Sequence, residues 1–150
     1  MKNTLFAILT ITLLSCGGAK EINETSTPAE EPIDVEFNIL INDIWVAETI
    51  LGERFEPNGN KMPQLEFQVK ENRFGGNDGC NSLGGSLKKL DNENLVFGPI
   101  MATKMACPDM EVSRQFNQAL SETQKYRIMK LRLYLMDSEG NDLMVLKKVD

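Results

Sequence analysis

Histidine is absent from this chain of 150 residues, and cysteine occurs only three times. Without histidine, the chain lacks the usual general base, the commonest metal ligand and the side chain that most often activates a catalytic serine or cysteine. The cysteines also lack the C-x-x-C spacing of redox enzymes. These absences argue against an enzyme, and we expect no catalytic residues and no cofactor.

Carboxylates remain as possible acid–base groups or calcium ligands, but they lie where turns are expected. Two pairs are close in sequence: Asp91 with Glu93, and Glu139 with Asp142. The calcium candidates are residues 77–79 and 137–142, and neither has the twelve-residue ligand series of an EF-hand. Asn, Asp and Gly are the residues that tight turns need. We therefore interpret both sets as turn residues and predict no metal site.

Positive charge is also scarce, with 16 Lys and Arg against 22 Asp and Glu and a net charge of -6. No basic stripe is present to neutralise a phosphate backbone, so nucleic acid is not an expected partner. Anionic lipid headgroups offer such a chain no attraction either. Any association with a membrane must therefore rest on something other than charge.

A short apolar run follows Lys2 near the N-terminus and extends from Leu5 to Leu14. A helix of this length rises only about 15 Å, which is half of the hydrocarbon core of a bilayer. A basic start followed by a short apolar run is typical of a secretion signal peptide rather than of a permanent span. We predict that residues 1–15 direct export and are then removed.

The segment Leu13-Leu14-Ser15-Cys16 resembles the lipobox of bacterial lipoproteins, with a small residue directly before the cysteine. We predict that Cys16 becomes the N-terminus and carries a lipid, including fatty acids such as palmitate. Two or three acyl chains anchor a protein far more firmly than one. Gly17 replaces the aspartate that retains enteric lipoproteins in the inner membrane, which favours the outer membrane of the cell envelope. The alternative is an ordinary signal peptide with Cys16 near its cleavage site by chance.

Residues 16–34 are predicted to form a flexible acidic tether. From Gly17 to Asp34 the chain has two prolines, five acidic residues, one lysine and no aromatic residue. Such a segment cannot bury enough apolar surface to offset its ordering entropy. The remaining residues, 35–150, are enough for one folded domain.

Alternating apolar residues predict several β-strands in this domain. Leu65, Phe67 and Val69 alternate with polar residues. Leu131–Leu135 and the apolar residues at 143–146 flank a turn at 137–141, which predicts a hairpin. Shorter strand candidates lie at 45–46, 86–87, 95–97 and 126–128.

One segment has helical spacing instead. Val112, Phe116, Ala119 and Leu120 fall on one face of a helix that we place at residues 109–122, with Asp109 as its N-cap. The fold class is therefore α+β: a small curved antiparallel β-sheet, an open or cracked barrel, packed with one main helix.

The motifs Gly79-Cys80-Asn81 and Thr103-Lys104-Met105-Ala106-Cys107-Pro108, followed by the helix and the final hairpin, resemble the META domain family. This family includes the HslJ-like heat-shock lipoproteins, and the resemblance covers about residues 43–148. Residues 82–85 depart from the family pattern, which usually has a basic or aromatic residue before its glycine. The resemblance implies an envelope protein, linked in some relatives to heat response, antibiotic tolerance or virulence. It implies no enzymatic activity and no catalytic residues.

With Cys16 assigned to lipid, two cysteines remain in an oxidising compartment, and we expect Cys80 and Cys107 to form a disulfide. Its closed loop of about 28 residues corresponds to roughly 3.6 kcal/mol in the chain-entropy model. A reactive thiol is the alternative, but no histidine is present to activate it. Glycines at 75, 76, 79, 84 and 85 predict a glycine-rich turn and little regular structure beside Cys80.

Met101, Met105 and Met110 lie on either side of Cys107, and soft thioethers in an envelope protein suggest a Cu(I)-binding alternative. The simpler interpretation is that these flexible apolar side chains fill the core.

Two functions fit these observations. The first, which we favour, is an interaction or scaffold module that displays a surface to another envelope protein and supports envelope integrity or stress tolerance. The second is a carrier of a small hydrophobic ligand, held in a cleft between the sheet and the helix that Phe97, Phe116 and methionines would line.

Overall fold

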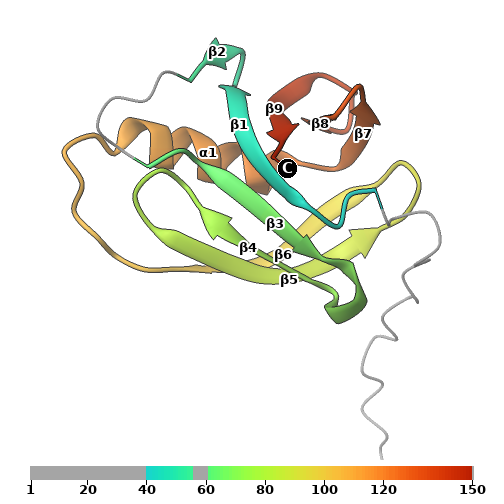
Figure 1. The fold of residues 1–150 in the computed structure, drawn as a ribbon, viewed down its shortest axis with the longest axis horizontal. Coiled ribbons are helices and arrows are strands. Elements are labelled where there is room, and N and C mark those ends of the chain that lie inside the picture. Colours follow the sequence, from blue (N-terminus) through green and yellow to red (C-terminus); the bar gives the residue numbers. More distant parts are fainter. Residues whose placement is uncertain (1–39, 56–60, 150) are drawn as a thin grey trace, which may run out of the picture.

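The computed structural model describes residues 40–55 and 61–149, so the predicted signal peptide, Cys16 and the tether lie outside the described residues. The described chain forms a curled antiparallel β-sheet that partly encloses one α-helix, which is the predicted α+β class (Figure 1). The elements, in chain order, are β1 (Ile44–Ile50), β2 (Glu53–Arg54), β3 (Gln64–Gln68), the short 3-10 helix η1 (Val69–Glu71), β4 (Arg73–Asn77), β5 (Ser82–Leu90), β6 (Leu95–Ala102), α1 (Glu111–Glu122), β7 (Lys125–Met129), β8 (Arg132–Met136) and β9 (Asp142–Lys148).

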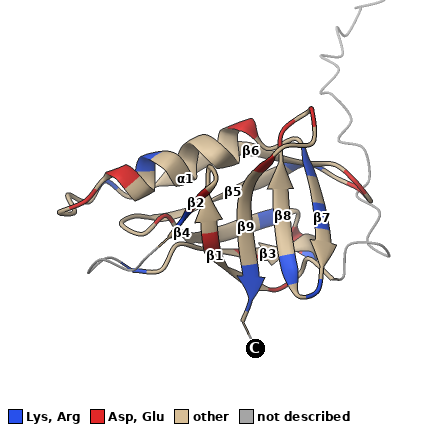
Figure 2. Ribbon diagram, turned by 90° about the horizontal axis from the view of Figure 1, so that it is seen from above, with Lys and Arg blue, Asp and Glu red and all other residues tan. Residues whose placement is uncertain are grey.

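The sheet is a half-barrel with its strands in the order β6-β5-β4-β3-β1-β9-β8-β7, and β2 pairs with β1. Among residues 40–55 and 61–149, its end strands β6 and β7 meet only where β6 begins. There Asn94 forms a bridge with Lys125, and the amide of Leu95 donates to the carbonyl of Gln124 across 3.1 Å. Helix α1 packs against β1, β8 and β9 and so closes the core from inside the curl (Figure 2).

The strands with the clearest alternation form as predicted. Leu65 and Phe67 of β3 are buried, while their neighbours are partly exposed. The predicted hairpin is β8 and β9, which pair Leu133 with Leu146. Burial of such aliphatic and aromatic side chains contributes roughly 1.5–3 kcal/mol each, and it fixes the face that each strand turns inward.

Helix α1 begins at Glu111, two residues later than predicted, and ends at Glu122 as predicted. Asp109 still supports its start, because Asp109 Oδ1 accepts a hydrogen bond from the amide of Glu111 across 2.9 Å. The predicted apolar stripe faces the core: Phe116, Ala119 and Leu120 are buried, and Val112 packs against the core while partly exposed. No helix in the described ranges is long and apolar enough to cross a membrane.

The expectation of irregular structure beside Cys80 is wrong. Gly75 and Gly76 belong to β4, and Gly84 and Gly85 belong to β5. Close approach of neighbouring strands explains Gly76 and Gly85: an added Cβ would lie 2.1 Å from the carbonyl oxygen of Gln64 at Gly76 and 2.4 Å from that of Pro99 at Gly85. Glycine in a strand marks such an approach as readily as it marks a turn.

Candidate functional site

The disulfide between Cys80 and Cys107 ties the segment after β4 to the loop 103–110, which leads into α1. The two Cα atoms are 5.9 Å apart, and Cys80 is buried. Asn81 adds two contacts to the same loop: its Oδ1 accepts the amide of Met105 across 2.8 Å and the hydroxyl of Thr103 across 3.3 Å. The start of this exposed loop is therefore held in one place.

Asp78 lies beside the disulfide and is 1% exposed. Its Oδ1 accepts the amides of Cys80 (2.9 Å) and Asn81 (2.6 Å), and its Oδ2 accepts the hydroxyl of Ser113 (2.7 Å) and the Nδ2 amide of Asn117 (2.8 Å). Burial acts to raise the pKa of Asp78, but these hydrogen bonds outweigh it and the net pKa is lowered. Both oxygens are thus used to fix the helix to the β4–β5 connection, which favours the turn interpretation over a calcium site.

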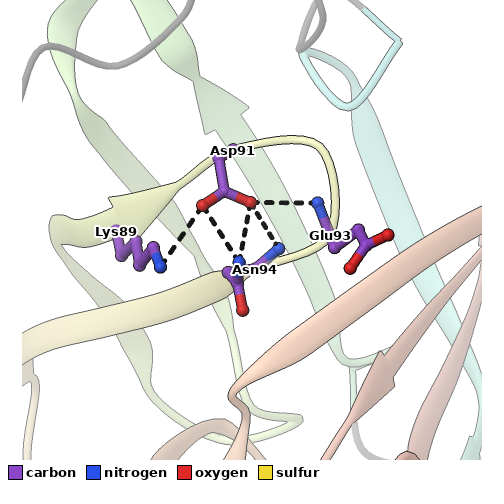
Figure 3. A network of polar contacts seen from close by, with 4 residues as sticks. All are labelled: Lys89, Asp91, Glu93 and Asn94. Carbon is purple, nitrogen blue, oxygen red and sulfur yellow. Dashed lines mark hydrogen bonds and ion pairs between the residues drawn. The ribbon is translucent and has the colours of Figure 1, made fainter.

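Asp91 caps the turn between β5 and β6, as Figure 3 shows. Its Oδ1 accepts the amides of Glu93 (3.0 Å) and Asn94 (2.8 Å), and the ammonium of Lys89 lies 3.4 Å from Oδ2. Burial acts to raise the pKa of Asp91, but the hydrogen bonds dominate and lower it to about 2. Glu93 contributes its backbone amide to this network, so Asp91 and Glu93 form a turn rather than an acid–base pair.

The turn between β8 and β9 follows the same pattern. Asp137 Oδ1 accepts the amides of Glu139 and Asn141, each across 2.9 Å. The side-chain amide of Asn141 also donates to Asp137 Oδ2 across 2.8 Å, and this hydrogen bond, with the backbone ones, lowers the pKa of Asp137. Across residues 40–55 and 61–149, no three His, Cys, Asp or Glu side chains gather in a way that could hold a metal ion.

The three methionines around Cys107 are at the surface. Met101 is 76% exposed, Met105 54% and Met110 43%, so the core-filling interpretation is wrong for all three. The reason is their position: Met101 lies in an end strand of the sheet, and the other two lie in the exposed loop that follows. The disulfide also removes Cys107 as a thiolate ligand for the Cu(I) alternative.

Phe97 and Phe116, expected to line a ligand cleft, are instead part of the packed core. Phe116 is fully buried, and the ring of Phe97 packs against Phe67 and Phe74 with centroid separations of 6.2 and 4.7 Å. Aromatic side chains in such contacts fill space rather than border it. The carrier hypothesis therefore loses the lining on which it was based.

A different surface stands out, on the outer face of β4, β5 and β6. Strand pairing places Gly75 beside Gly84 and Gly84 beside Met101. The two glycines expose backbone without side chains, which we call the glycine floor, and Met101 is the exposed apolar side chain next to it. A groove of about 670 Å³ extends over this floor, and a second of about 290 Å³ lies beyond Met101. We call this region the Met101 surface: Gly75, Gly84, Ser86, Pro99, Met101, Ala102 and Thr103.

The Met101 surface was not predicted from the sequence. The available signal was β6 itself, whose residues LVFGPIMA contain no charge although six of the eight are exposed or partly exposed. By contrast β7, at the other end of the sheet, carries Lys125 and Arg127. An uncharged end strand is unusual, because charged residues normally prevent such strands from pairing with other chains.

A further groove, of about 390 Å³, lies near β1 and β8 and is polar. Its charges are already paired: Arg132 binds Glu48 with both Nε (2.6 Å) and Nη2 (3.2 Å). These hydrogen bonds lower the pKa of Glu48. A ligand in this groove would have to compete with the ion pair between Arg132 and Glu48. We therefore consider the Met101 surface the better candidate site.

Comparison with known proteins identifies the family. A sequence model of the META domain matches residues 38–150. An NMR structure aligns with a TM-score of 0.57 and 21% identity, covering 71% of this chain and 89% of that chain. An NMR structure of a protein from Burkholderia xenovorans aligns with a TM-score of 0.58 and 19% identity, covering 87% and 99%.

A crystal structure of a DUF4847 family protein from Bacteroides vulgatus aligns with a TM-score of 0.50 and 15% identity, covering 75% of this chain and 98% of that chain. The comparison with curated proteins found no match. At these identities the structures support the fold alone. The family match, however, extends from before β1 to beyond β9 and so includes every element of the sheet and the helix, and the chain therefore belongs to the META domain family.

Proposed function

We propose that this protein is a lipid-anchored lipoprotein of the bacterial cell envelope with a non-enzymatic interaction domain. The META domain binds another envelope protein through the Met101 surface and thereby supports envelope integrity or stress tolerance. The observation that carries the proposal is the setting of Met101: a 76% exposed apolar side chain between two grooves, beside a glycine floor.

Single apolar residues at a surface are common and need no function. Met101 differs because its neighbours on β5 and β4 have no side chains to cover it. Methionine is flexible and polarisable, and it is used frequently at surfaces that bind polypeptides. The combination of a deformable side chain and an open floor supports a protein partner over a small polar ligand.

The position of this surface relative to the proposed anchor is also favourable. The segment 40–43, which leads into β1, and the loop 103–110 lie at opposite ends of the long axis of the domain (Figures 1 and 2). A lipid on Cys16 would hold the domain from the end where segment 40–43 lies. The loop end, into which β6 runs, is then the end to which the anchor is not attached, and it stays accessible to other envelope proteins.

Photo-crosslinking in cells tests this proposal. A photoreactive amino acid replaces Met101 in the full-length chain, and a matched variant carries it at Leu131, which is 61% exposed in the β7–β8 turn. We expect position 101 to capture a discrete envelope protein and position 131 to capture none. Equal capture at both positions contradicts the proposal.

The same sample distinguishes the carrier alternative. Native mass spectrometry of the extracted protein detects any small molecule that remains bound. A lipid present at one molecule per chain, together with no protein captured at position 101, overturns the interaction module and favours the carrier.

A further inference from the structure

β6 ends the sheet and is paired on one side only for most of its length. It pairs with β5 from Leu95 to Ala102. On its other side, pairing among the described residues is confined to the start of the strand, where residues 93–95 meet residues 124–126 at the start of β7. The second half of β6, which includes Met101, therefore has an open edge within the described part of the chain.

The hydrogen-bond pattern identifies which backbone groups face this open edge. The amide of Thr103 donates to the carbonyl of Ser82 on the β5 side across 3.0 Å. In antiparallel pairs, successive residues point their backbone groups alternately toward and away from the partner strand. Met101 therefore points its amide and carbonyl toward β5, whereas Ile100 and Ala102 point theirs outward.

These outward groups have no protein partner within residues 40–55 and 61–149. They form two donors and two acceptors at the spacing that a neighbouring strand requires. Pro99 has no backbone N–H to donate, but it precedes Ile100 and lies where the pairing with β5 is irregular, between Gly85 and Leu87. It therefore removes none of these four groups. The edge also lacks charge, so nothing repels an incoming apolar strand.

We propose that the partner binds by strand addition: an extended segment of another polypeptide pairs with Ile100 and Ala102 and continues the sheet beyond β6. This inference rests on the proposed function and names the chemistry of its partner. Main-chain hydrogen bonds supply affinity, and side chains on alternate positions supply specificity. On the outer face, an apolar residue of the added strand packs against Met101.

The chemistry of this edge favours an extended segment over a second copy of the domain. Pairing two copies antiparallel through Ile100 and Ala102 would bring the loop 103–110 of one copy against the irregular segment 98–99 of the other. That loop cannot move aside freely, because the disulfide and Asn81 hold its start. A free extended segment meets no such obstacle.

A backbone substitution tests strand addition separately from side-chain contact. Ala102→Pro removes the outward amide of residue 102, which no described residue uses, and Ala102→Val keeps that amide with a larger side chain. Both are made in the full-length chain that carries the crosslinker at position 101. We expect Ala102→Pro to reduce the crosslinked product at least tenfold and Ala102→Val to reduce it less than twofold, with both thermal midpoints close to that of the parent.

The outcomes separate the two proposals. Capture that persists in Ala102→Pro overturns strand addition but leaves the interaction module intact, whereas absence of capture in the parent overturns the module itself. A crosslinked product of two copies of this chain also overturns the inference. If Ala102→Pro unfolds the domain, hydrogen exchange on the parent decides: the amides of Ile100 and Ala102 must exchange more slowly in the purified complex than in the free protein, and unchanged exchange contradicts the inference.

Discussion

The hydroxyl of Ser113 on α1 donates a hydrogen bond to the Asp78 carboxylate across 2.7 Å, although the two residues are 35 positions apart in sequence. Both are buried. This contact joins the helix to the β4–β5 connection next to the disulfide. A buried carboxylate with four donors is a strong local constraint, since each donor left unpaired in the interior is costly.

Asp78→Ala should therefore lower the free energy of unfolding by roughly 2–4 kcal/mol, because it leaves buried donors without an acceptor. Gln118→Ala, on the exposed face of the same helix, should change it by less than about 0.5 kcal/mol. Urea denaturation followed by circular dichroism measures both. Equal stability of the Asp78 variant and the parent would show that water replaces the carboxylate without cost.

Asp91 predicts a dependence of stability on pH. Its pKa is about 2 in the folded domain, below the value of about 3.9 for an unfolded chain. A lowered folded-state pKa contributes stability that is complete above about pH 4 and is lost as the pH falls toward 2. Asp91→Asn should thus be less stable than the parent at neutral pH, with a difference that narrows below pH 4.

The control for this measurement is Glu93→Gln, because the Glu93 side chain takes no part in the hydrogen bonds of Figure 3. Thermal midpoints between pH 2 and pH 7 give the comparison. A difference in thermal midpoint between Asp91→Asn and the parent that stays constant over this range would contradict a lowered pKa of Asp91 in the folded domain.

Phe116→Ala should cost about 3–5 kcal/mol, because Phe116 is fully buried between the helix and the sheet. Leu131→Ala, at a 61% exposed position, serves as the matched apolar control and should cost far less. Denaturant midpoints at constant slope measure the two changes. A midpoint of the Phe116 variant close to the parent would show that the core repacks around the cavity.

Reduction of the Cys80–Cys107 disulfide should lower the thermal midpoint, since it restores conformational freedom to the unfolded chain. Roughly 3.6 kcal/mol is the upper figure for a loop of this length. A variant with alanine at both positions should melt at the same temperature with and without a reductant. Reductant sensitivity in that variant would indicate that the effect arises elsewhere.

Cys16→Ala should move the protein from the membrane fraction to the soluble fraction while the domain stays folded, because Cys16 is far in sequence from the first described strand. Fractionation after salt and carbonate washes, with the parent as control, measures the change. If the variant remains with membranes, lipid on Cys16 is not the anchor.

Much of the fold could be predicted because its strands are buried on one face. Leu65 and Phe67 alternate with polar neighbours, and the β8–β9 hairpin carries turn residues between two apolar runs. Strand β4 was missed because Gly75 and Gly76 have no side chain to alternate. Gly76 is required because the backbone of β3 lies too close for a Cβ. The local sequence carries no sign of that contact, and a glycine pair in a turn would look the same.

The candidate site was missed for a related reason. Exposure of Met101 depends on which strands lie beside β6, because Gly84 and Gly75 leave its side chain uncovered, and strand order cannot be derived from local periodicity. Met101 was therefore expected in the core, where methionine in a strand usually lies. The turn at Asp91, in contrast, was predicted correctly, because all its donors lie within three residues of the carboxylate.

The pairing of β1 with β9 also has a consequence for how the domain assembles. These are the first and last strands of the described chain, and they are neighbours in the middle of the sheet. Until β9 joins the sheet, β1 has only one long neighbour, β3. Because contacts between such distant segments form slowly, the two halves of the sheet should join late, in a single cooperative step.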